Sequence, residues 1–258
     1  MDESDPAVHN RKAWDSLVKK GNQWTKPVSP EEIAATRDGT WNIVLTPEKP
    51  IPTDWLMPVA GKKILCLAGG GGQQAPILAA AGADVTTIDN SPGQLEQDQV
   101  VAKREGLTIG SVLGDMRDLS AFEDESFDMI VNPCSNSFVP NVNPIWKECH
   151  RVLKVGGSLM VGFINPLTHI FDYDKMEAGE LLVRHKIPYS DYDLPDRERQ
   201  ALIDQEEPLW FGHSLDDQIG GQIAAGFAIT GMYEDSWKEL NALSDYIDLF
   251  IATRATKI

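Results

Sequence analysis

The sequence of 258 residues is short of positive charge. It has 23 lysines and arginines against 39 aspartates and glutamates, a formal net charge of −16. Nucleic-acid binding draws much of its free energy from basic side chains that neutralise phosphates. The acidic balance therefore argues against a nucleic-acid partner and favours a small-molecule or cationic substrate.

Cysteine is also scarce. Cys66, Cys134 and Cys149 are odd in number and none forms a Cys-x-x-Cys pair, so neither a disulfide framework nor a zinc site is indicated. None of the five histidines shows metal-ligand spacing, and we expect no metal. These absences favour a reducing compartment and predict a cytoplasmic protein.

The sequence shows neither the pattern of an export signal nor that of a membrane-spanning helix. The first ten residues, MDESDPAVHN, are acidic where a signal peptide would be basic, and no apolar core region follows them. The charge-free stretch from Ile64 to Ala83 is long enough to span a bilayer, but it holds five glycines, two glutamines and Pro76. We expect this stretch to be buried in protein and expect no membrane partner.

What the sequence does contain, from residue 63 onward, is a regular alternation of short apolar runs and helical stretches. Continuous apolar strands that alternate with helices indicate a parallel sheet covered on both faces. The fold class is therefore α/β, with a doubly wound, mostly parallel, seven-stranded sheet. We expect strands at 62–68, 84–89, 107–114, 127–132, 158–165, 227–235 and 248–256, and helices at 8–20, 75–83, 92–106, 143–154 and 214–226.

The rhythm also divides the chain. Residues 1–62 form an N-terminal helical and cap segment, in which the Pro- and Trp-rich part from 21 to 60 is expected to wrap around the rest. Residues 63–258 form the main domain. Within it the polar stretch 167–212 interrupts the alternation, and we expect a lid-like insertion over the sheet edge after the fifth strand.

The stretch ILCLAGGGGQQ, residues 64–74, places four glycines directly behind the first strand. A glycine turn there lets a ligand approach the backbone and leaves helix N–H groups facing it. The alternative is a close crossing of strand and helix. Asp89, at the end of the second strand, can accept hydrogen bonds from ribose hydroxyls. At this point both NAD and S-adenosylmethionine remain open as cofactors.

Later segments help to separate the two. Asp115 follows the third strand within GDMRDLSAFEDESFDMIV, RVLKVGGSLMV turns into the fifth strand, and no Tyr-x-x-x-Lys pair occurs. With these motifs the stretch from Lys63 to Pro166 resembles the class I S-adenosylmethionine-dependent methyltransferases, specifically their type 11, UbiE-like branch. The C-terminal GHSLDDQIGGQIAAGFAITGMYED resembles the tail of a bacterial subgroup within that branch.

The resemblance implies a Rossmann-like fold, S-adenosyl-L-methionine as cofactor, and a transferase that methylates a small-molecule acceptor by in-line displacement. Gly70 and Gly72 would lie under the methionine part, Asp89 would hold the ribose, and Asp115 with Met116 would meet the adenine. The full set of implied cofactor-binding residues is Ala68, Gly70, Gly72, Gln74, Asp89, Asn90, Asp115, Met116 and Asn132.

Two positions depart from the family's usual pattern. Cys66 stands where an acidic residue is common, and Ala68 replaces the first glycine. The missing acid removes an expected partner for the cofactor's ammonium group, whose recognition would pass to backbone carbonyls or to Gln73 and Gln74.

Catalytic residues are harder to predict, because alignment and exclusion of water carry much of the rate of methyl transfer. The loop NPCSNSF after the fourth strand suggests Asn132, Ser135 and Asn136 as pocket-lining candidates, and His213 is a further one. The alternatives are an NAD(P)-dependent Rossmann oxidoreductase and a non-catalytic S-adenosylmethionine-binding module. Neither the acceptor nor the oligomeric state can be inferred from the sequence.

Overall fold

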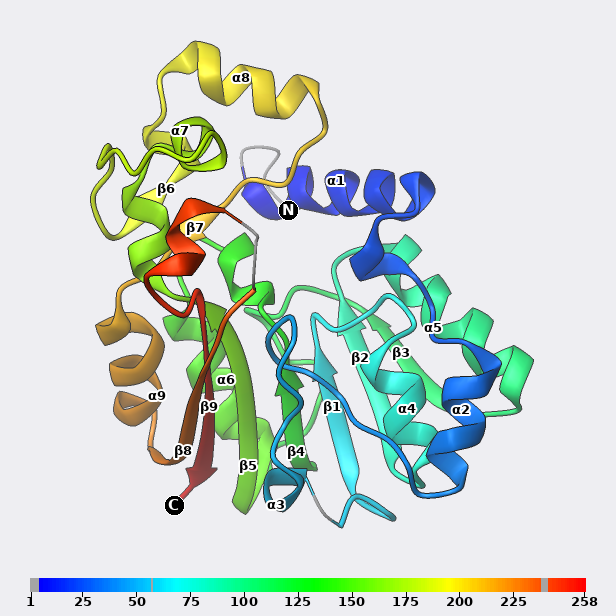
Figure 1. Ribbon diagram of the computed structural model, residues 1–258. Coiled ribbons are helices and arrows are strands. Elements are labelled where there is room, and N and C mark those ends of the chain that lie inside the picture. Colours follow the sequence, from blue (N-terminus) through cyan, green and yellow to red (C-terminus); the bar gives the residue numbers. More distant parts are fainter. Residues whose placement is uncertain (1–4, 57, 238–240) are drawn as a thin grey trace.

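A seven-stranded sheet forms the centre of the computed structural model, which describes residues 5–56, 58–237 and 241–258 (Figure 1). The strand order is β3-β2-β1-β4-β5-β9-β8, with β1 to β5 parallel and β9 antiparallel to both neighbours. The predicted doubly wound sheet is confirmed. Its strands are β1 (Lys63–Leu67), β2 (Asp84–Asp89), β3 (Ile109–Leu113), β4 (Phe127–Asn132), β5 (Leu153–Ile164), β8 (Phe227–Asp235) and β9 (Phe250–Lys257).

Both faces of the sheet are buried. In β1, Ile64 and Cys66 belong to one hydrophobic cluster, and Leu65 and Leu67 belong to another on the opposite face. This alternation explains why the strand is apolar throughout. The helices are α1 (Pro6–Lys20), α2 (Pro30–Arg37), α3 (Thr53–Leu56), α4 (Gln74–Ala80), α5 (Pro92–Glu105), α6 (Asn143–Val152), α7 (Tyr173–Glu177), α8 (Asp196–Asp204) and α9 (Gly221–Ala224).

Local signals set the ends of α5. Ser91 is its N-cap and accepts a hydrogen bond from the Gln94 N–H, and Pro92 occupies the first turn. The helix ends at Gly106, whose φ of 67° lies in the left-handed region. α5 thus covers all but the last residue of the helix predicted at 92–106.

Several element boundaries differ from the prediction, most of all those of β5 and of the expected helix 214–226. β5 begins at Leu153, directly after α6, because Leu153 already pairs with Phe127 before the sheet register shifts. The expected helix 214–226 is a π-helical turn, Asp216–Gly220, followed by the single turn of α9. Among the described residues no helix is both long and apolar enough to cross a membrane.

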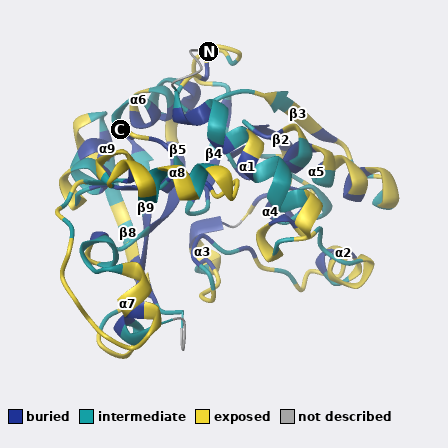
Figure 2. Ribbon diagram, turned by 90° about the horizontal axis from the view of Figure 1, so that it is seen from above, coloured by how far each residue is buried: buried dark blue, intermediate teal, exposed yellow. Residues whose placement is uncertain are grey.

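Segments outside the sheet gather at the edge where the parallel strands end. α1 lies across this edge in Figure 1, beside the insertion that carries α7, α8 and the two-stranded sheet of β6 (Tyr189–Ser190) and β7 (Phe211–Gly212). Figure 2 looks down on the edge and shows α8 largely exposed, and α8 has no buried residue. Because β1 pairs with β2 on one side and β4 on the other, the strand order reverses under this cover, which is where such sheets bind ligands.

Candidate cofactor and acceptor site

The glycine turn after β1 is tied down by three hydrogen bonds from consecutive N–H groups. Gly70 donates to Asp89 Oδ2 at 3.1 Å and Gly71 donates to the Gln94 carbonyl at 2.9 Å. Gly72 donates to Asp98 Oδ1 at 2.7 Å. These N–H groups face protein acceptors on β2 and α5, and not a ligand as the sequence suggested.

Close packing is what requires glycine here. A Cβ on Gly70 would lie 2.8 Å from the Gln94 Cβ, and one on Gly72 would lie 2.9 Å from Pro27. Gly71 and Gly72 also have φ values of 108° and 76°. The turn therefore forms a close crossing, clamped between α5 and residues 24–27.

Ala68 begins the same turn in a strained conformation. Its φ is 44°, in the left-handed region, while its N–H donates to the Ile88 carbonyl at 2.8 Å. A non-glycine residue pays about 1–2 kcal/mol for this backbone. Ala68 thus adopts a backbone conformation that glycine takes without this strain.

Asp89 ends β2 as a buried carboxylate that accepts two backbone N–H groups, from Gly70 and, at 2.9 Å, from Ser91. Burial raises the pKa of Asp89 to about 6 against these bonds, and the charge of Asp15 adds to the rise. The neighbouring Asn90 is engaged by α1. It donates to the Ala7 carbonyl at 2.6 Å, and its oxygen accepts from Arg11 Nε at 3.1 Å.

Asp115 follows β3 and is part of a three-residue ion cluster. Arg117 Nε lies 3.0 Å from both of its carboxylate oxygens, and Arg117 Nη2 lies 2.8 Å from Asp5, the N-cap of α1. Met116 is buried in the cluster that contains Ile88. The adenine-side residues expected from the sequence therefore lie together beneath the start of α1.

The loop after β4 collects the candidates for the acceptor side. Asn132 donates to the Leu67 carbonyl at 2.8 Å and to Ser135 Oγ at 2.6 Å. Asn136 donates to Gln218 Oε1 at 2.8 Å, and its carbonyl lies 3.1 Å from His213 Nε2. A carbonyl only accepts, so this ring nitrogen carries the proton. Burial lowers the pKa of His213.

Two buried side-chain oxygens at the end of β4 and in the loop after it make no hydrogen bond to the described residues. Neither Asn132 Oδ1 nor Asn136 Oδ1 has a hydrogen-bond partner among the described residues. Buried polar atoms are nearly always paired in folded proteins. Both atoms are therefore suited to accept a hydrogen bond from a bound molecule.

The N-terminal segment closes the site from above. Val28 N–H donates to the Gly72 carbonyl at 2.8 Å, and the Gln73 amide donates to the carbonyls of Gln23 and Lys26. Gln74 turns toward the same segment, with its amide nitrogen 3.4 Å from the Val44 carbonyl. The amide nitrogens of Gln73 and Gln74 thus hold the cover, whereas an ammonium group would be accepted by their carbonyl oxygens.

An aromatic wall joins three distant segments on the acceptor side. Trp14 of α1 meets Phe138 edge-to-face at a centroid distance of 5.1 Å. Trp210 of the insertion meets the same ring at 4.7 Å. The cap segment, the loop after β4 and the insertion are therefore packed as one unit around this loop.

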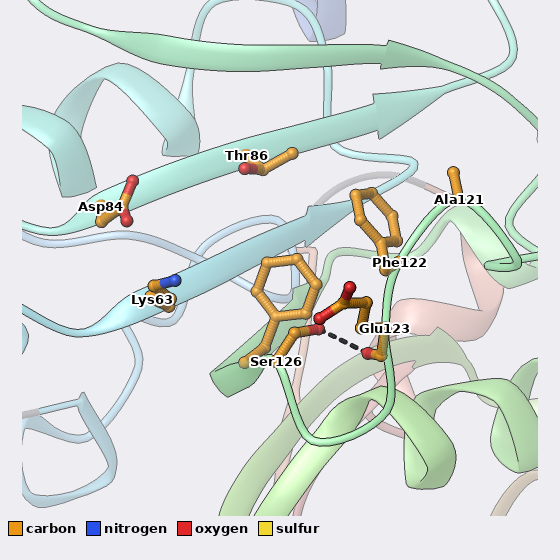
Figure 3. A pocket seen from close by; sticks show the side chains of 8 residues that line it. Lys63, Asp84, Thr86, Ala121, Phe122, Glu123 and Ser126 are labelled. Carbon is orange, nitrogen blue, oxygen red and sulfur yellow. Dashed lines mark hydrogen bonds between the residues drawn. The ribbon is translucent and has the colours of Figure 1, made fainter.

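Two cavities lie away from this edge. One of about 230 Å³ sits where β1 and β2 begin, between Lys63, Asp84 and Phe122 (Figure 3). Another of about 290 Å³ lies in the insertion beside His185 and Tyr189. Within the described ranges, no group of three or more His, Cys, Asp or Glu side chains could hold a metal ion.

Sequence reasoning missed the carboxylate of Asp98. It lies on the inner face of α5, three residues after Leu95 and three before Val101, both of which are buried. A charged residue in the apolar stripe of a helix is the signal that could have identified it.

Several known proteins are similar in sequence to this chain. A family model described as "Methyltransferase domain" matches residues 65–161. A protein of Bacillus subtilis (strain 168) named "Uncharacterized methyltransferase YbaJ" is 54% identical over 252 residues, covering 97% of this chain and 98% of the relative. A "Ubiquinone biosynthesis O-methyltransferase" of Xylella fastidiosa (strain 9a5c) is 27% identical over 231 residues, covering 85% of this chain and 87% of its own.

Solved structures share the fold. A putative S-adenosylmethionine-dependent methyltransferase from Listeria monocytogenes has a TM-score of 0.59 at 18% identity, covering 80% of this chain and 95% of its own. One from Mesorhizobium loti has a TM-score of 0.60 at 17% identity, covering 79% and 94%. Together with the relatives, these similarities decide against the NAD(P)-dependent oxidoreductase that the glycine motif alone left open.

Proposed function

The chain belongs to the S-adenosylmethionine-dependent methyltransferases, and from this premise we propose that it methylates a small-molecule acceptor held between the loop after β4 and the insertion. The proposal rests on two buried side-chain oxygens, Asn132 Oδ1 and Asn136 Oδ1, near the carboxyl end of β4. Neither has a hydrogen-bond partner among the described residues. They lie near the carboxyl ends of the parallel strands, where sheets of this kind bind ligands.

The residues present fit this cofactor. Asp89 is a buried carboxylate at the end of β2 and would hold the ribose hydroxyls. Asp115 and Met116 would border the adenine, and Ala68 and Gly70 would lie beside the methionine part. Asn132 Oδ1 would accept a hydrogen bond from its ammonium group. When bound, the cofactor supplies a methyl group activated by a sulfonium.

The protein's own contribution is to orient and enclose. Because positive charge disperses during displacement at a sulfonium, alignment and exclusion of water carry much of the rate. The wall of Trp14, Phe138 and Trp210 excludes water from the acceptor side. His213 holds the Asn136 carbonyl and thereby orients the loop, so we assign it a positioning role and no proton transfer.

The size of the acceptor is inferred from the cover and the charge. The ends of the parallel strands are covered by residues 23–28, residues 44–46 and the insertion. This cover favours an acceptor small enough to be enclosed. The net charge of −16 disfavours nucleic acid. The similarity to a protein named as a ubiquinone biosynthesis O-methyltransferase also supports a small acceptor. Three free cysteines support a cytoplasmic location as part of the proposal.

Binding and turnover separate this proposal from a non-catalytic module, which the strained Ala68 and the neutral Cys66 would favour. Calorimetry should show binding of S-adenosylmethionine, and incubation with fractionated metabolites should release S-adenosylhomocysteine. Trp210→Ala should lower turnover at least about tenfold with cofactor affinity unchanged, since its ring packs on Phe138 of the loop proposed for the acceptor. Binding without turnover on any fraction would support the module.

A further inference from the structure

Asp98 is a buried carboxylate that none of the roles above uses. Its side chain is 0% exposed, and Oδ1 accepts the Gly72 N–H at 2.7 Å. The Thr87 side chain also bonds to this carboxylate. Burying a carboxylate costs free energy, and folded proteins retain such groups where another property depends on them.

The surroundings of Asp98 are polar. Thr87 bonds to the carboxylate, and Gln94 Oε1 is buried without a partner in the described part of the chain. Burial raises the pKa of Asp98 to about 7, with the charge of Asp89 adding to the rise and bonds from Thr87 and Gly72 opposing it. The site is therefore poorly optimised for stability.

The glycine turn depends on Asp98 at its tightest point. Gly72 has a φ of 76°, and its Cβ position lies 2.9 Å from Pro27 and 3.0 Å from the Gln97 carbonyl. The Gly72 carbonyl accepts a hydrogen bond from the Val28 N–H, so Gly72 is held between the N-terminal segment and α5. Asp98 is the acceptor that satisfies this N–H and fixes the end of the turn.

Cys66 packs under the same turn from the strand side. The Cβ position of Gly69 lies 3.3 Å from the Cys66 Cβ. Burial, and in addition the charge of Asp98, raises the pKa of the Cys66 thiol, which therefore stays neutral. The position that the family resemblance expects to be acidic supplies no charge, while α5 supplies a carboxylate within electrostatic reach of it.

We propose that Asp98 is a positioning residue of the cofactor site: from α5 it supplies the carboxylate that Cys66 lacks and holds the glycine turn through Gly72. The acidic residue next to the turn thus lies on α5, at Asp98, and not on β1, at position 66. This inference rests on the proposed function, because it requires the turn to border the cofactor.

The test removes the carboxylate from position 98 and introduces one at position 66. Titration calorimetry with S-adenosylhomocysteine compares the wild type, Asp98→Ala, Cys66→Asp and the double variant Cys66→Asp/Asp98→Ala. Glu96→Ala, an exposed position on the same helix, is the matched control. We expect Asp98→Ala to weaken binding about tenfold or more, and the double variant to return to within about threefold of the wild type.

A second readout needs no ligand. Hydrogen exchange of the Gly72 amide in the free protein should accelerate in Asp98→Ala and slow again in the double variant, whereas Glu96→Ala leaves it unchanged. If Asp98→Ala unfolds, Asp98→Asn keeps an oxygen for the Gly72 N–H without the charge, and it should still bind at least about threefold more weakly than the wild type.

Three outcomes overturn the idea: wild-type affinity in folded Asp98→Ala, wild-type affinity in Asp98→Asn where that variant is used, or a double variant that binds no better than Asp98→Ala. A wild-type protein that binds no S-adenosylhomocysteine would instead remove the proposed function on which the inference rests. The two failures are thus distinguishable.

Discussion

Replacing Asp89 by alanine tests the assignment of the nucleoside end of the site. The carboxylate closes β2 and would accept two hydrogen bonds from ribose hydroxyls. Hydrogen bonds to a charged group contribute about 1.5–3 kcal/mol, so we expect a loss of about 2 kcal/mol in binding. That corresponds to an increase of roughly thirtyfold in the dissociation constant of S-adenosylmethionine.

The structure adds a second effect that the assay must separate. Asp89 also accepts the N–H groups of Gly70 and Ser91, so the alanine variant leaves both without this acceptor. Each unsatisfied buried group costs about 1–3 kcal/mol, and thermal unfolding should show a lower Tm. Asp84→Ala, at the exposed start of the same strand, is the control and should change neither quantity.

Isothermal titration calorimetry is the deciding measurement, made well below the Tm of each variant. The pKa of Asp89, raised to about 6 by burial, adds a pH signature. Wild-type affinity should fall as the pH drops through about 6, since a protonated carboxyl accepts more weakly. Asp89→Ala should lose this part of the pH dependence and keep only the part due to Asp98, whose pKa is about 7. A folded Asp89→Ala protein that binds as the wild type does, with the same pH profile, refutes the assignment.

Three further outcomes follow from the same structure. Ala68→Gly should raise the free energy of unfolding by about 0.5 kcal/mol in urea, because it relieves left-handed strain but adds unfolded-state entropy; a less stable variant would contradict this. Arg117→Ala should speed hydrogen exchange in α1 about fivefold, since its link to Asp5 is lost, and unchanged exchange would show that α1 docks independently of it. The pKa of Asp98 is higher in the folded protein than in the unfolded chain, so it binds more protons when folded and lowers stability as the pH rises from about 4 to about 7. Asp98→Asn should remove up to about 1.4 kcal/mol per pH unit of that slope in pH-dependent urea unfolding, and parallel curves would count against it.

Much of the sheet could be predicted from the sequence because its strands are short, apolar and bounded by turn residues. β2 and β4 span the predicted residues, and the caps of α5 lie at Ser91 and Gly106. The early start of β5 could not be predicted, since Gly156 and Gly157 interrupt the apolar run and resemble a turn. Pairing with β4 overrides that local signal.

The candidate site was predictable only where a residue closes a strand. Asp89 and Asn132 end β2 and β4, Asp115 lies two residues after the end of β3, and the fold brings all three to one edge. The cover over that edge depends on contacts between residues far apart in the chain, such as Arg117 with Asp5, and such pairings leave no local pattern. For the same reason the N–H groups of the glycine turn were expected to face a ligand.

The position of β9 between β5 and β8 has a consequence for biosynthesis. β9 is the last strand of the sheet to be translated, yet it pairs with both neighbours along most of its length. During synthesis β5 and β8 therefore wait with unpaired backbone edges that can join other chains. A variant truncated before residue 250 would leave both edges unpaired and should aggregate more readily than the full chain.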